Sequence, residues 1–192
     1  MQKTEAETFY PTNQQEWRQW LEENHASKQA VWVVMHKKAS NKPSISWSDA
    51  VDVALCYGWI DSVKRSVDSE SSIQFFSKRK PKSAWSKINK AKVERLIEEG
   101  LMRAAGLACI ETAKQNSSWI ILDEVEELTI PHDLEQALKD QPGAEPFFLN
   151  LSRSVKKAML QWLVLAKRTE TRQNRINEIA QLAALKQKPK QF

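Results

Sequence analysis

The run AVWVVMHK at residues 30–37 is the feature that most constrains the fold. Its β-branched and aromatic residues favour a strand, and apolar side chains fall on both of its faces. A strand of this kind lies inside a sheet, because both of its faces need cover. The chain must therefore supply partner strands for it.

A hairpin is the nearest source of partner strands. The segments 59–67 and 72–79 carry apolar residues on either side of the turn Asp68-Ser69-Glu70. Ser46 is followed three residues later by Asp49, a spacing typical of a capping box at a helix start. Helices are predicted over 12–24, 46–58, 86–100 and 102–115.

From about residue 130 the apolar period is helical throughout, with helices predicted over 131–142, 152–166 and 170–186. The acidic segment 123–129 reads as a linker. The predicted fold is α+β: a small antiparallel sheet of about three strands with helices, followed by an all-helical C-terminal subdomain. The expected divisions are 9–122 for the α+β part and 130–186 for the helical subdomain packed on it, with flexible tails at 1–8 and 187–192.

Composition limits the location of the protein. Eight tryptophans in 192 residues argue against disorder. No apolar run approaches the roughly 20 residues that span a bilayer, and the N-terminus lacks a signal region. The two cysteines, Cys56 and Cys109, make no disulfide framework. We expect a cytoplasmic protein with reduced thiols and no membrane insertion, and the oligomeric state stays open.

Positive charge is concentrated in two stretches of the chain. Its net charge is +5, and residues 71–93 hold seven cations and no carboxylate. Residues 150–175 hold seven more cations against the single acid Glu170. This segregation favours a negatively charged partner: a small anionic ligand, an acidic protein or nucleic acid.

Several blocks together resemble one known family. They are CYGWIDS at 56–62, RKPKSAWSKIN at 79–89, GLMRAAGLACIETAK at 100–114, IPHDLEQAL at 130–138 and AKRTETRQNRI at 166–176. In this order they are similar to the YdeI/OmpD-associated, or bacteriocin-protection, family from about residue 9 to 185. The resemblance implies an α+β first half, a helical second half and a link to stress resistance. It implies no catalytic mechanism.

The segment CYGWIDS is the first candidate site. Trp59 offers an apolar wall and Asp61 a carboxylate beside it, a combination common in ligand pockets. The alternative is that Gly58 ends a helix, Trp59 is a core residue and Asp61 either acts as a cap or pairs with a nearby cation.

The second candidate site is the basic segment before the helix expected at Ser86. The free N–H groups at that helix start, with the cations just upstream, favour a phosphate, sulfate or carboxylate. The alternative is a solvated loop with an ordinary cap. The residues concerned are Arg79, Lys82, Ser83, Trp85, Ser86 and Asn89.

Thr171 and Arg172 form the third candidate site, since an arginine can grip an acidic group in a bidentate manner. The alternative is that Arg172 and the neighbouring cations pair with Glu170 and the acids near Asp123. These neighbouring cations are Lys167, Arg168 and Arg175. The sharper hypothesis is that Arg172 and the helix start at Ser86 meet Trp59 and Asp61 in one basic, Trp-lined cleft between the two halves.

Chemistry beyond binding has little support in the sequence. Cys56 with His25 or His36 is a candidate nucleophile pair, but its place on an apolar helix favours a buried structural thiol. No metal-binding or phosphate-loop motif occurs, so we expect no metal and no cofactor. We predict an accessory, stress-protection protein that binds a small anionic ligand or an acidic partner. Nonspecific nucleic-acid binding is the alternative, and a hydrolase or transferase using Asp61 and Cys56 ranks below it.

Overall fold

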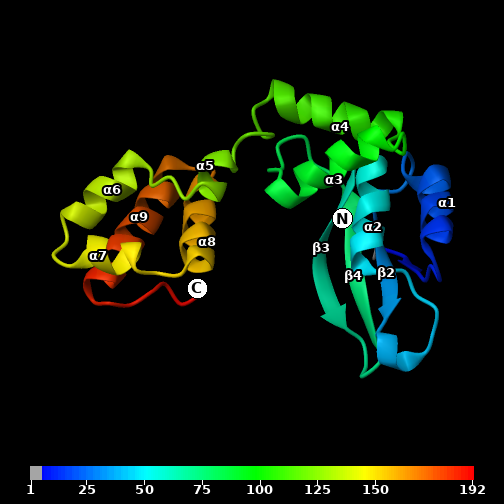
Figure 1. Ribbon diagram of the computed structural model, residues 1–192, viewed down its shortest axis with the longest axis horizontal. Helices are drawn as coiled ribbons and strands as arrows, with labels where there is room; N and C mark the ends of the chain where they lie inside the picture. Colours follow the sequence, from blue (N-terminus) through cyan, green and yellow to red (C-terminus); the bar gives the residue numbers. More distant parts are fainter. Residues whose placement is uncertain (1–5) are drawn as a thin grey trace, which may run out of the picture. The chain divides into compact units, whose positions relative to one another are not determined.

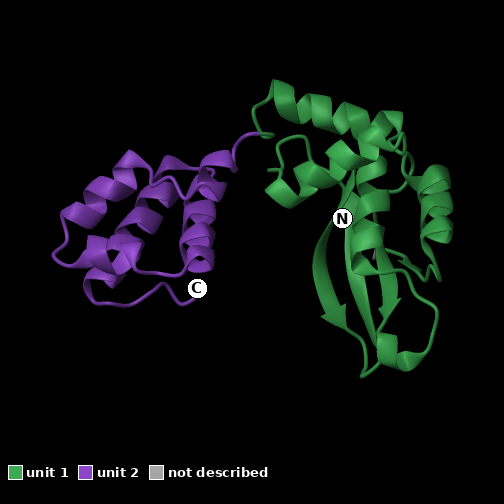
Figure 2. Ribbon diagram, viewed as in Figure 1, with its two compact units in different colours: residues 1–119 green, residues 120–192 purple. Residues whose placement is uncertain are grey.

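The structure, a computed structural model, describes residues 6–192. The chain divides into two compact units, unit 1 up to Trp119 and unit 2 from Ile120 to Phe192 (Figure 2). The predicted α+β class with a helical C-terminal part is confirmed. Of the tail expected at 1–8, residues 1–5 lie outside the described residues.

Unit 1 contains a four-stranded sheet in the order β1-β2-β4-β3. Figure 1 shows β4 between β2 and β3. The predicted hairpin is β3 and β4, which pair antiparallel, and the central strand β2 pairs antiparallel with β4. A bulge between Asp61 and Lys64 interrupts the β3–β4 register. The strands are β1 (Thr8–Phe9), β2 (Ala30–His36), β3 (Trp59–Ser66) and β4 (Ser71–Lys78).

The strand β1 was not predicted, because two residues carry no period. Thr8 and Phe9 pair parallel with Trp32 and Val33 of β2, which makes the sheet mixed. Phe9 stacks on Trp20, with ring centroids 5.7 Å apart. The segment before the first helix is therefore held in two ways. Its backbone pairs with β2, and the Phe9 ring contacts Trp20.

Helix α2 is the centre of unit 1 and contacts β3, α1, α3 and α4. Seven consecutive residues of α2, from Ala50 to Cys56, are buried, and all of them except Asp52 are apolar. Ser46 caps α2 by accepting from the Asp49 N–H at 3.1 Å, as predicted. The helices of unit 1 are α1 (Gln14–Asn24), the short 3-10 turn at Lys38–Ser40, α2 (Trp47–Cys56), α3 (Lys87–Glu98) and α4 (Ala104–Gln115).

Unit 2 is helical throughout. The long helix α9 contacts α6, α7 and α8, and the side chains between them include Leu134, Phe148, Leu163 and Ile176, all fully buried. Ser152 caps α8 by accepting from the Val155 N–H. The helices are α5 (Asp123–Glu126), α6 (His132–Lys139), α7 (Ala144–Leu149), α8 (Arg153–Val164) and α9 (Thr169–Ala184).

Two segments of unit 2 differ from the expectation of irregular chain. The acidic segment 123–129 holds α5, which contacts α8. Val125 of α5 is buried, and the Glu126 carboxylate pairs with Lys157 of α8 at 2.7 Å. The last residues turn back after α9: Pro189 is buried, and the Phe192 ring lies 5.7 Å from that of Trp162. Apolar side chains hold both segments in place.

No helix in the described part of the chain is both long enough and apolar enough to span a membrane.

Candidate functional site

The chain reverses sharply between α2 and β3, and Gly58 makes this possible. Its φ of 73° lies in the left-handed region, where a side chain would be strained. Trp59 then points into the core, is fully buried, and meets Trp20 edge-on at 5.8 Å. The structure thus places Trp59 in the interior rather than at a binding surface, because it fills the centre of an apolar cluster.

Asp61 lies two residues further along β3 and has partners from two other elements. Its Oδ2 accepts from the Trp47 indole at 2.9 Å and from the Gln74 amide at 3.3 Å. Trp47 is half exposed and Gln74 is buried. Asp61 therefore links β3 to the start of α2 and to β4 through neutral donors, and not through the nearby cation that the alternative expected.

Arg79 follows β4, and three contacts draw its side chain into unit 1. Its backbone N–H donates to the Gly58 carbonyl at 2.9 Å. Its Cζ lies 3.7 Å from the centroid of the Trp85 ring, a close cation–π contact, and its Nη2 donates to the Ala84 carbonyl at 2.6 Å. As a result the residue is only 8% exposed.

The guanidinium of Arg79 is nevertheless short of partners. Its Nε and Nη1 are buried and have no hydrogen-bond partner within residues 6–192, and no carboxylate there forms an ion pair with it. Burial lowers the pKa of Arg79 to about 10, so the group still carries its charge at neutral pH. A buried cation without a counter-ion is costly, and binding an anion would offset that cost.

Arg79 and Trp85 line a pocket of about 150 Å³ in unit 1. Its lining contains two cations and no carboxylate, and most of the remaining wall is apolar. The residues that α4 contributes to the lining lie on one face of that helix. The lining residues are Arg79, Lys80, Pro81, Trp85, Ala105, Ala108, Cys109 and Thr112.

The segment between β4 and α3 is held in shape by its own hydrogen bonds. Ser83 donates to the Lys80 carbonyl at 2.8 Å, and Asn116 donates to the Pro81 carbonyl at 2.8 Å. Ser86 caps α3, as predicted, by accepting from the Asn89 N–H at 3.3 Å. The pocket wall is therefore fixed before any ligand enters.

The structure brings together only part of the second predicted site. Arg79 and Trp85 line the pocket, whereas Lys82, Ser83, Ser86 and Asn89 lie on the same segment outside its lining. The sequence reasoning missed the four residues from α4. Ala105, Ala108, Cys109 and Thr112 follow the i, i+3, i+4, i+7 spacing of one helix face, and this pattern was the available signal.

Cys109 is the thiol that lines this pocket. Its Sγ lies 3.7 Å from the Gly58 carbonyl oxygen, the same oxygen that accepts from the backbone of Arg79. Burial raises the pKa of the Cys109 thiol, while the charge of Arg79 opposes that rise. The thiol is therefore largely protonated at neutral pH, and it adds a weakly polar wall and no negative charge.

Cys56 is shielded from any substrate by burial in α2. It is fully buried, its Sγ donates to the Asp52 carbonyl at 3.3 Å, and Arg18 donates to the sulfur at 3.5 Å. Burial raises the pKa of this thiol. The geometry favours the structural reading of Cys56 over a nucleophile.

Thr171 and Arg172 lie in unit 2 at the start of α9, and Arg172 is fully engaged there. Its Nε and Nη2 donate to the two carboxylate oxygens of Asp133 at 2.7 and 2.8 Å, a bidentate pair that joins α9 to α6. Its Nη1 donates to the Leu163 carbonyl at 3.4 Å. The partner is thus an acid of unit 2 that was not anticipated. The expected meeting of Arg172 with residues of the first half stays a prediction.

The Asp133–Arg172 pair predicts a pH dependence of stability. The hydrogen bonds from Arg172 lower the pKa of Asp133 below its ordinary value. Because the folded pKa is the lower one, the pair stabilises unit 2 above the unfolded pKa of about 3.9, and this is lost as the pH falls through the folded pKa. Both side chains are partly exposed, so we expect about 1 kcal/mol at pH 7.

Denaturant unfolding of the wild type and Asp133→Asn at several pH values measures this contribution. The difference between the two proteins should be largest at pH 6–7 and should shrink as the pH falls below about 4, the unfolded pKa. A difference that stays constant down to pH 2.5 would rule out the charge of Asp133 as its source.

Among residues 6–192, no group of three or more His, Cys, Asp or Glu side chains is placed to hold a metal ion.

Two family profiles match the chain, and their matches lie on either side of the boundary between unit 1 and unit 2. Residues 9–109, more than half of the chain, match the profile of a domain of unknown function (DUF8412). Residues 127–186 match the profile described as "Bacteriocin-protection, YdeI or OmpD-Associated", which confirms that part of the resemblance seen in the sequence. No curated protein and no solved structure matches the chain.

Proposed function

The chain belongs to the family defined by this domain of unknown function and ends in a YdeI or OmpD-associated (bacteriocin-protection) domain, and we propose that it binds a small anion at Arg79. The observation that carries the proposal is a buried guanidinium with two N–H groups unpartnered among the described residues, at the wall of a pocket without carboxylates. An anion that accepts hydrogen bonds from these N–H groups would stabilise folded unit 1.

The pocket favours a small carboxylate as the anion. A volume of about 150 Å³ accommodates an acid of a few carbon atoms. The carbon chain of such an acid would contact the apolar side chains of Trp85, Ala105 and Ala108. Its carboxylate would be attracted by the charges of Arg79 and Lys80.

In the cell this binding would serve an accessory, stress-protection role. The free thiols of Cys56 and Cys109 are in keeping with a reducing compartment, and we place the protein in the cytoplasm on that ground. An acidic protein partner that inserts a carboxylate side chain would satisfy the same pocket chemistry as a free acid.

Replacing Arg79 tests the proposal. In the wild type, 10 mM of an acid with a Kd near 1 mM should stabilise unit 1 by about 1.4 kcal/mol and raise its Tm by a few degrees. Arg79→Met should abolish this response, yet leave the ligand-free protein within about 1 kcal/mol of the wild type, because the variant also removes an unpaired buried charge. Tryptophan fluorescence follows the transition, since seven of the eight tryptophans lie in unit 1.

Arg65→Met is the matched control for this experiment. Arg65 is also an arginine of unit 1 stacked over an indole, with its Cζ 4.7 Å from the Trp32 ring, but it is exposed. The control should respond to the acid like the wild type. If Arg79→Met costs 2 kcal/mol or more and acetate, pyruvate and phosphate all leave the wild type unchanged, Arg79 only braces Trp85 and the proposal fails.

Nonspecific binding of nucleic acid is the second candidate, and the surroundings of Trp119 favour it. The ammonium groups of Lys90 and Lys114 lie 5.3 and 5.5 Å from the centroid of its ring. Such a pairing of cation and indole suits a single strand, whose bases stack while its phosphates meet the lysines. A single-stranded oligonucleotide bound in this way would weaken steeply with salt and would be indifferent to Arg79→Met.

A further inference from the structure

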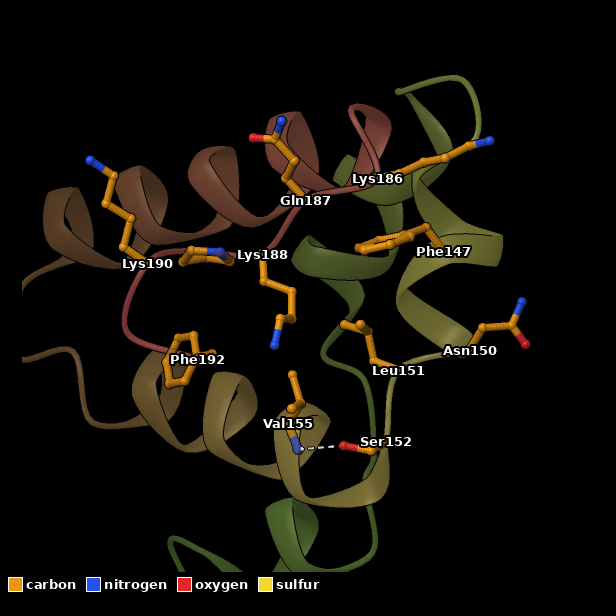
Figure 3. Close-up of a pocket in the computed structure, with 11 residues that line it drawn as sticks. Phe147, Asn150, Leu151, Ser152, Val155, Lys186, Gln187, Lys188, Lys190 and Phe192 are labelled. Atoms are coloured by element: carbon orange, nitrogen blue, oxygen red, sulfur yellow. Dashed lines mark hydrogen bonds between the residues drawn. The ribbon is translucent and has the colours of Figure 1, made fainter.

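A second pocket lies within unit 2, between the α7–α8 connection and the segment that follows α9 (Figure 3). Its volume is about 610 Å³, inside the range of roughly 300–1,000 Å³ that is usual for small-molecule sites. None of its lining residues belongs to the Arg79 pocket. The lining residues are Phe147, Asn150, Leu151, Ser152, Val155, Lys186, Gln187, Lys188, Pro189, Lys190 and Phe192.

Apolar side chains make up much of the wall. Val155 lies in the first turn of α8, and Leu151 lies just before that helix (Figure 3). Phe192 is the last residue of the segment that follows α9. The Phe192 ring is held by an edge-on contact with Trp162 at 5.7 Å. The Trp162 ring also makes a cation–π contact with Arg175, whose Cζ lies 4.6 Å from the ring centroid. This wall is thus supported from outside the pocket.

The charged side chains of the lining are all positive. Lys186, Lys188 and Lys190 contribute three cations, and the lining contains no carboxylate side chain. The ammonium groups of Lys186 and Lys190 point away, whereas the Lys188 side chain runs into the pocket toward Leu151, Val155 and Phe192 (Figure 3). Within the described residues Lys188 makes no ion pair.

Lys188 is exposed, so water reaches its ammonium, and no acidic side chain of the lining lies beside it. Its stem can lie along the apolar surface, as lysine stems commonly do. A bare anion would satisfy the ammonium and leave the apolar wall wet. A neutral apolar compound would cover the wall and leave the ammonium poorly solvated.

We propose that this pocket of unit 2 binds an anionic amphiphile, a molecule with one carboxylate or phosphate head and an alkyl body. The head group pairs with Lys188, and the alkyl body lies along Leu151, Val155 and Phe192. Lys186 and Lys190 at the rim add attraction for the head group at longer range. This inference is independent of the Arg79 site, since it rests on other residues in the other unit.

Calorimetric titration with decanoate, below its micelle-forming concentration, tests the proposal. We expect one decanoate to bind per chain, and Lys188→Glu to weaken the binding at least tenfold. Lys167→Glu is the matched control, because it makes the same change of charge at an exposed lysine of unit 2 outside the pocket and should change the Kd less than threefold. Arg79→Met should also leave the Kd unchanged, which separates this site from the one in unit 1.

Three further arms identify the ligand chemistry. Decyl phosphate binding more tightly than decanoate assigns a phosphate head, and the reverse order assigns a carboxylate. Octyl glucoside, which has no charge, and inorganic phosphate, which has no alkyl body, should each bind at least tenfold more weakly. The proposal is overturned if either of these binds as tightly as decanoate, if Lys188→Glu binds like the wild type, or if no saturable binding occurs.

Discussion

Gly106→Ala should destabilise unit 1 by about 3 kcal/mol, because α4 has no room for a side chain where it crosses the end of α2. A Cβ at residue 106 would lie 2.4 Å from the Cys56 carbonyl oxygen and 2.7 Å from that of Leu55. Both are backbone atoms of a buried helix end and cannot swing aside. The helix α4 would have to withdraw, and the packing of Ile110 and Ala113 in the core would loosen.

Urea unfolding followed by tryptophan fluorescence measures this loss, with Gly100→Ala as the control. A Cβ at Gly100 would meet nothing within 4 Å, so its cost comes only from the positive φ of 68° and should be about 1 kcal/mol. Equal losses in the two variants would show that α4 does not need its close approach to α2. Since α4 carries Cys109 and Thr112, Gly106→Ala should also weaken the response to a small acid.

Asp52→Ala should cost about 3 kcal/mol, since Asp52 neutralises two cations from a neighbouring helix. Asp52 is buried in α2, and its two carboxylate oxygens pair with Lys92 and Arg95 of α3. The Lys92 side chain is only 15% exposed, and its ammonium also donates to the Ser48 hydroxyl at 2.9 Å. Removing the carboxylate would leave Lys92 as a largely desolvated, uncompensated charge.

Glu99→Ala and a double variant test the cause of this loss. Glu99 is the exposed partner of Arg95 in the same helix, and its removal should cost less than about 0.5 kcal/mol. Replacing Lys92 by Met together with Asp52→Ala should recover 1 kcal/mol or more, because the stranded charge is gone. If Asp52→Ala is no worse than Glu99→Ala, the pair is solvated and contributes little.

Local sequence signals predicted most of the elements, because their ends carry chemical markers. Ser46, Ser86 and Ser152 each cap a helix by accepting from the N–H three residues on. Helix α7 was missed, since six residues with Pro146 near their start show no period. Strand β1 was missed because its pairing with β2 spans more than 20 residues of chain.

Only the part of the candidate site formed by residues close together in the sequence could be predicted. Arg79 and Trp85 are six residues apart, and a basic segment with an indole drew attention to both. The burial of Arg79 depends on α4 and on Gly58, which no local pattern reports. The partner of Arg172 was missed for the same reason: Asp133 lies 39 residues away and meets it only through packing of α6 on α9.

The most direct measurement is an NMR titration that observes the Nε–H signals of the arginine side chains. The Arg79 signal is identified by its absence from Arg79→Met, and the nearby Trp85 ring displaces it from the other arginines. Anion binding at the buried guanidinium predicts that this signal moves saturably with acetate or pyruvate while that of Arg65 stays in place. Identical, unsaturable drifts of both signals, or no movement at Arg79, would contradict it.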